Sequence, residues 1–95
     1  MDLTVIYGND EWSMMIKSIV DFAVEIARRE YGVKVEVYEV VLEGFKGVNL
    51  EIDGVRELHI VDVPSVRELV EVLVVASRIT IPITPSLGET GLATA

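Results

Sequence analysis

The chain has 95 residues, which is enough for one small domain. Its composition, 51% hydrophobic and 25% charged, is typical of a globular protein and excludes an intrinsically disordered chain. The net charge of −8 would repel a phosphate backbone, so nucleic acid is not an expected partner. The absence of cysteine excludes thiol nucleophiles, disulfides, iron–sulfur clusters and thiolate zinc sites.

The first half of the chain begins with a predicted strand and a long helix. Residues 3–7 form a β-branched apolar run that ends at Gly8, which favours a buried strand. Apolar residues then recur at spacings of three and four from Asp10 to Tyr31, and Gly32 follows. This pattern predicts a helix that begins at Asp10 and ends at Gly32.

The middle of the chain is predicted to form three strands. Residues 33–38 alternate between valine and polar or aromatic residues, as in a strand with one buried face. The stretch 44–47 breaks the pattern, and two further alternating runs, 48–53 and 55–63, flank Asp53 and Gly54. This dipeptide predicts a hairpin turn. A bulge near Val55 would place Leu50 and Ile52 on the same face as Leu58 and Ile60.

A second helix is predicted from residue 65 to about residue 77. Ser65 and Glu68 form a capping box after Pro64. The apolar surface of this helix is wider than a single buried face, because Val72 and Val75 lie outside the main apolar stripe. In the first helix, Phe22 and Val24 widen the apolar face in the same way. We expect one domain over residues 1–78 and an extended tail over 79–95.

The predicted order of elements over residues 2–78 resembles the thioredoxin-like fold, and specifically small archaeal glutaredoxin-like proteins. The resemblance lies in the first strand and helix, in the hairpin turn at 50–54, and in the sequence of residues 63–69. It implies a two-layer α/β fold with a mixed sheet and two main helices. The alternative is a ferredoxin-like βαββαβ sandwich, in which residues 79–83 form a last strand.

The resemblance also implies where redox chemistry would lie, and the chain departs from the family there. Trp12 and Met15 stand at the positions of the family's CxxC motif, and Val48 stands at the position of its cis-proline. The stretch 41–47 is too short for the family's middle helix. The resemblance therefore implies a scaffold without redox activity.

Few residues are candidates for chemistry. His59 is the single histidine, and we interpret it as a structural or solvated side chain because it has no second histidine or cysteine as a co-ligand. Several carboxylates alternate along the predicted strands, and we interpret them as a solvated face: Glu36, Glu39, Glu43, Glu51 and Asp53. We expect no catalytic residue, no metal site and no cofactor.

The expected function is a non-enzymatic module that self-associates, most simply as a two-fold dimer, or binds an unidentified protein partner. The alternative is a ferredoxin-like regulatory domain that binds a small ligand. Candidate contact residues are Trp12, Met14, Met15, Val48, Val72 and Val75. Of these, Trp12 and Met15 are expected in the core by their helical spacing, whereas Met14 is expected on the surface.

The chain is also expected to be cytoplasmic and not to associate with membranes. Its uninterrupted apolar run at residues 72–76 is far shorter than the roughly 20 residues that span a bilayer. The acidic start Met1-Asp2-Leu3 lacks the basic region of a secretion signal. Glutamine is absent, which favours a source in a hot environment.

Overall fold

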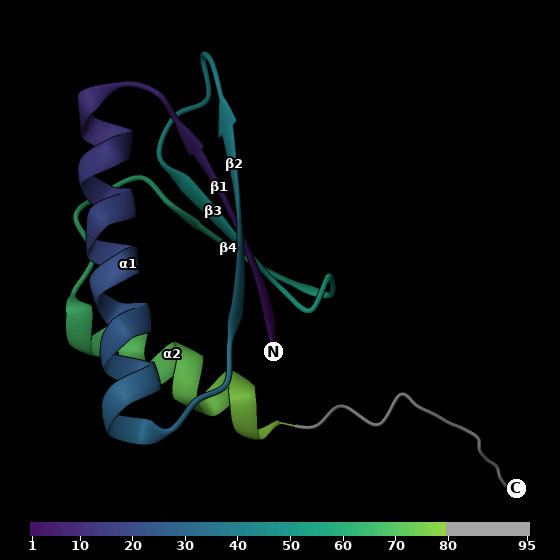
Figure 1. Cartoon of the computed structure of the whole chain (residues 1–95). Helices are drawn as coiled ribbons and strands as arrows, with labels where there is room; N and C mark the ends of the chain where they lie inside the picture. Colours follow the sequence, from purple (N-terminus) through teal and green to yellow (C-terminus); the bar gives the residue numbers. More distant parts are fainter. Residues whose placement is uncertain (80–95) are drawn as a thin grey trace, which may run out of the picture.

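The computed structural model describes residues 1–79, which form an α/β fold with one mixed four-stranded sheet and two helices (Figure 1). The elements are β1 (Asp2–Gly8), α1 (Glu11–Tyr31), β2 (Glu36–Leu42), β3 (Val48–Ile52), β4 (Arg56–Ile60) and α2 (Val66–Arg78). The strand order is β2-β1-β3-β4, in which β1 and β2 are parallel and the other pairs are antiparallel. The α/β class is confirmed, and residues 80–83 of the predicted last strand lie outside the described residues.

Both ends of α1 lie where the sequence predicts them. Asp10 is the N-cap, and its side chain accepts a hydrogen bond from the Ser13 amide at 3.0 Å. Gly32 ends the helix in the left-handed conformation, with φ of 66°, and its N–H donates to the carbonyl of Ala27. These contacts satisfy backbone groups that every helix end leaves free.

The strand predicted at residues 33–38 is shifted along the chain to Glu36–Leu42. Pairing with β1 begins at Asp2 opposite Glu36, so the residues before Glu36 lie beyond the end of β1. Val33 and Val35 are nevertheless buried. The alternation in this stretch therefore indicates burial in the core. The first residue of the strand depends instead on where β1 begins.

The β3–β4 hairpin confirms both the turn and the extra residue predicted after it. Asp53 and Gly54 have φ of 53° and 70°, and the Val55 N–H donates to the Ile52 carbonyl at 3.1 Å. Because Ile52 lies opposite Arg56, Val55 has no partner in the ladder. Leu50 consequently lies opposite Leu58 on one face of the sheet.

Both helices lie on one face of the sheet (Figure 1). α1 packs on β1 and β3, whereas α2 packs mainly against α1 and crosses it near the end of the sheet. The core lies between these layers and includes Leu3, Val5, Ile16, Val20, Leu50 and Leu73. Val24 belongs to this core, so its predicted place in a surplus apolar face is wrong, whereas Phe22 is exposed.

A small polar cluster joins the start of α1 to the loop before β3. The fully buried Ser13 hydroxyl donates to Asp10 Oδ1 at 2.7 Å and accepts a hydrogen bond from the Gly47 N–H at 2.8 Å. Hydrogen bonds from the Ser13 side chain and then from its amide lower the pKa of Asp10. Ser13 therefore fixes both the helix cap and the entry into β3.

Replacing Ser13 with alanine is expected to lower the free energy of unfolding by about 1–3 kcal/mol, because the buried Gly47 N–H loses its acceptor. Urea denaturation measures the change. Ser18→Ala is the matched control, since Ser18 is an exposed serine of the same helix, and it should stay within about 0.5 kcal/mol of the unaltered protein. Equal losses in both variants would contradict the role given to Ser13.

Candidate functional site

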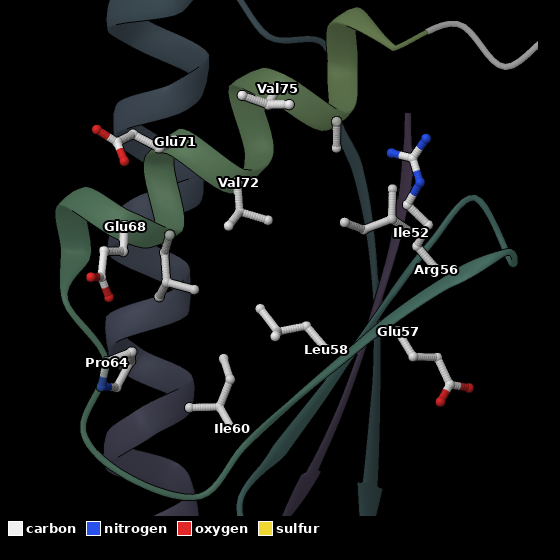
Figure 2. A pocket seen from close by; sticks show the side chains of 12 residues that line it. Ile52, Arg56, Glu57, Leu58, Ile60, Pro64, Glu68, Glu71, Val72 and Val75 are labelled. Atoms are coloured by element: carbon white, nitrogen blue, oxygen red, sulfur yellow. The ribbon is translucent and has the colours of Figure 1, made fainter.

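An apolar groove of about 750 Å³ lies between α2 and the β3–β4 hairpin (Figure 2). It exists because α2 packs mainly against α1 and leaves the inner side of the hairpin partly uncovered. The side chains that give it its apolar character are Ile52, Leu58 and Ile60 from the hairpin and Leu69, Val72 and Val75 from α2. We call this space the α2–hairpin groove.

The α2 side of the groove follows from how the helix is capped and which residues it buries. Ser65 is the N-cap and accepts a hydrogen bond from the Glu68 amide at 3.3 Å, which is one of the two bonds of the predicted capping box. Leu69, Val70, Leu73 and Ala76 are buried. By contrast, Val72 is 37% exposed and Val75 is 55% exposed, so the apolar surface of α2 exceeds what the domain covers.

The hairpin side presents Leu58 to the groove. Leu58 is 38% exposed, although Leu50 lies directly opposite it in the ladder and is buried. In Figure 2, Val72, Leu58 and Ile60 point toward one another across the open space. A side chain entering here would therefore meet apolar surface from two elements at once.

The charges around the groove are mostly acidic. Glu68 and Glu71 lie along the first half of α2, and Figure 2 shows both carboxylates directed away from the open space. Arg56 and Glu57 contribute one positive and one negative charge at the hairpin. The polar groups therefore frame the apolar surface, as at many protein contacts.

The remaining predicted contact residues of α1 form a separate patch. Trp12 is 48% exposed, and Met14 and Met15 are also exposed, so the expectation that Trp12 and Met15 lie in the core is wrong. The Trp12 indole N–H donates to the Val61 carbonyl at 2.7 Å, which holds the ring over the loop after β4. Helical spacing predicts a common face, but the core beneath α1 begins at Ser13 and Ile16.

Val48 does not belong to any contact surface, and its predicted role is wrong. It is fully buried on the helix-covered side of the sheet, between Tyr7 of β1 and Ile60 of β4. Its alternation with Asn49 along β3 already places it on the same side as the buried Leu50. That alternation is the sequence signal that separates it from Val72 and Val75.

His59 and the strand carboxylates do not gather into a metal-binding cluster within the described residues. His59 is exposed on the open face of the sheet, where its ring and that of Phe45 pack in a T-shaped arrangement with 5.5 Å between centroids. Within residues 1–79, no three histidine or carboxylate side chains lie close enough together to hold a metal ion. Asp53 instead accepts a hydrogen bond from the Asp2 amide at 2.8 Å.

Glu39 takes part in an ion-pair network that links α1 to β2. Lys17 Nζ lies 2.8 Å from both Asp21 Oδ2 and Glu39 Oε2, and 5.3 Å from the centre of the Tyr7 ring. Burial by itself lowers the pKa of Lys17, but the hydrogen bonds to Asp21 and Glu39 outweigh it and raise that pKa. Lys17 therefore stays charged and pairs with both carboxylates, so the three groups together carry one net negative charge.

Comparison with known proteins adds no further assignment. No family model matches the chain, and neither curated proteins nor solved structures show significant similarity to it. In the described part of the chain, neither helix combines the length and apolar character needed to cross a bilayer.

Proposed function

We propose that this protein is a non-enzymatic, self-associating module on a redox-inactive thioredoxin-like scaffold, and that two copies meet through α2. The observation that carries this proposal is the apolar face of α2, which the domain itself leaves open. Val72, Val75 and Ile79 follow one another at spacings of three and four and are all exposed. Val72 and Val75 lie on one face of α2 and line the α2–hairpin groove, and the exposed C-cap residue Ile79 continues this apolar surface beyond the last turn.

The occupant that fits this apolar surface best is a second copy of the chain. When two α2 helices lie antiparallel about a two-fold axis near Leu73 and Val74, Val72 of each copy faces the partner's Val75. The charges support the same arrangement, because Glu68 and Glu71 lie in the first half of α2 and Arg78 lies in its last turn. Antiparallel pairing brings Arg78 close to the partner's Glu71.

The sheet topology supports a thioredoxin-like scaffold over the ferredoxin-like alternative. β1 and β2 are direct parallel neighbours joined through α1, and β3 and β4 extend the sheet on the other side of β1. In a ferredoxin-like sandwich the crossover spans an intervening strand, which gives a split βαβ unit. The adjacency of β1 and β2 does not have that form.

The handedness of crossovers supports the same choice. The ferredoxin-like alternative needs residues 79–83 as a strand, and the free edge nearest to α2 is that of β4. β4 runs parallel to β1, and α1 and α2 cover the same face. A strand parallel to β4 and outside it would lie on the side of the sheet away from β2. The crossover from β4 through α2 to that strand and the crossover from β1 through α1 to β2 would then have opposite hands, so one of them would be left-handed. About 98% of such crossovers are right-handed, which disfavours the ferredoxin-like alternative.

Solution mass tests the proposed contact. At micromolar concentration, sedimentation should show a species heavier than one 10.5 kDa chain. Val75→Glu should separate copies joined through α2 while helix content stays unchanged, because it buries a charge in an apolar contact. Added salt should strengthen the association of the unaltered protein, since it screens repulsion between chains of net charge −8.

Val55→Glu is the matched control for this prediction. It introduces the same charge at an exposed valine on the hairpin turn, outside the groove, and it should leave the mass unchanged. A wild-type protein of one chain mass would contradict self-association. A Val75→Glu protein that unfolds would show that Val75 belongs to the domain's own core.

A further inference from the structure

β2 is an edge strand whose outer side faces no other strand within residues 1–79. Four of its seven residues are exposed apolar side chains, between 41% and 51% exposed: Tyr38, Val40, Val41 and Leu42. Proteins usually protect such edges with lysine, proline or a bulge. β2 contains neither lysine nor proline, and its only charged residues are Glu36 and Glu39, whereas the opposite edge strand, β4, carries Arg56, Glu57 and His59 among its five residues.

The free backbone groups of β2 can be identified from its pairing with β1. The Glu36 N–H donates to the Met1 carbonyl at 2.9 Å, so the even-numbered residues direct their backbone groups toward β1. Because these directions alternate along a strand, the N–H and C=O groups of Val37, Glu39 and Val41 point to the open edge. These groups are the ones that another strand could bind.

The side chains of β2 alternate in the same way. Val37 lies beside Leu3, on the face that the helices cover. Tyr38, Val40 and Leu42 therefore lie on the opposite face of the sheet, which carries no helix in the described part of the chain (Figure 1). A strand added at this edge would meet a row of apolar side chains on an open, accessible face.

Charge favours one register over its two neighbours for a second β2 added antiparallel about a two-fold axis. Pairing Glu39 with the partner's Val41 uses the free backbone groups and sets Val40 opposite the partner's Val40. It also sets Tyr38 opposite the partner's Leu42. The neighbouring registers oppose Glu39 to the partner's Glu39 or Glu43, and like charges directly opposite each other destabilise a pair of strands.

The surroundings of Glu39 favour this pairing further. Lys17 holds the Glu39 carboxylate at 2.8 Å on the helix-covered face. Glu39 supplies free backbone groups at the centre of the edge, and its carboxylate already has an ion-pair partner on its own chain, which that partner shares with Asp21. Its carboxylate does not have to lose a partner when the strands pair.

We propose that β2 is a second self-association surface, on which another copy of this chain adds its own β2 antiparallel to form one continuous eight-stranded sheet. This surface is distinct from the α2 contact and does not depend on it. A protein with both contacts would assemble beyond a dimer, because each copy would join one neighbour through α2 and another through β2.

The experiment uses Val75→Glu as the background, so that only the β2 contact remains. This variant should sediment as two chains, and Val75→Glu/Val40→Lys should sediment as a single chain of 10.5 kDa, because the two introduced lysines face each other across the axis. Val75→Glu/Val41→Pro should raise the dissociation constant at least about tenfold, because it removes one edge N–H donor from each copy. Hydrogen exchange at the Glu39 and Val41 amides should be slow in the two-chain species and fast in the single chain.

Val75→Glu/His59→Lys is the matched control, with the same change from a neutral residue to lysine on the same face at the opposite edge. It should retain the two-chain mass. The β2 proposal is overturned if Val75→Glu is already a single chain, or if Val40→Lys leaves its mass unchanged. If Val75→Glu instead leaves the mass of the unaltered protein unchanged while Val40→Lys lowers it, the α2 contact fails and the β2 contact stands.

Discussion

Replacing Gly8 with alanine should destabilise the protein by about 3 kcal/mol or more, because the added methyl group has no space. A Cβ atom at this position would overlap the backbone oxygen of Phe45 and would lie 2.8 Å from Asp10 Oδ1 and 2.9 Å from Ser13 Oγ. Relief of the overlap would also move the Gly8 N–H away from the Gly47 carbonyl, which it meets at 3.2 Å. Urea denaturation followed by circular dichroism measures the loss.

Gly44→Ala separates this steric effect from the general cost of replacing a glycine. Gly44 has a φ of 82° but no atom within 4 Å of its added Cβ, so this variant should lose only about 1–2 kcal/mol, the cost of the left-handed conformation. A Gly8→Ala protein as stable as Gly44→Ala would mean that the loop carrying Phe45 can move aside. The close approach at Gly8 would then not be a structural requirement.

Leu50→Ala is expected to cost about 2–5 kcal/mol, whereas Leu58→Ala should cost about 1 kcal/mol or less. The two leucines lie opposite each other in the β3–β4 ladder and share one face of the sheet. They differ in cover, since Leu50 is 1% exposed beneath α1 and Leu58 is 38% exposed in the α2–hairpin groove. Removing Leu50 leaves a cavity in the core, and removing Leu58 only widens an open groove.

Both leucine variants should be compared by denaturant unfolding in the Val75→Glu background. The proposed α2 contact is already lost there, so it does not contribute to the measured free energy of unfolding. In the unaltered background, Leu58→Ala should weaken self-association if the partner's helix reaches the groove floor. Equal stability losses for the two leucines would mean that α2 covers Leu58 as completely as α1 covers Leu50. The groove would then be closed in solution.

Features whose physical cause is local can be predicted from the amino-acid sequence. The ends of α1 depend on Asp10 and Gly32, which satisfy free backbone groups within one turn of the helix. The hairpin depends on Asp53 and Gly54, which adopt positive φ, and the extra residue at Val55 follows from the mismatch between a two-residue turn and the apolar alternation. Each of these interactions joins residues close together in the chain.

Which of the apolar side chains are buried depends on the tertiary packing. Trp12 and Val75 both extend apolar stripes and are exposed, while Val48 and Val24 are buried. Helical or strand spacing places a residue on a face, but burial depends on which distant element packs against that face. The same limit applied to β2, whose bounds follow its partner strand β1.

The α2–hairpin groove shows most clearly the difference between features that the sequence predicts and features that depend on packing. The excess apolar surface of α2 can be read from Val72 and Val75 in the sequence, because no single buried face needs both. The groove beside these valines cannot be predicted from the sequence, because it arises where α2 packs mainly against α1 and not directly on the hairpin. That choice depends on contacts between residues far apart in the chain, which local spacing does not encode.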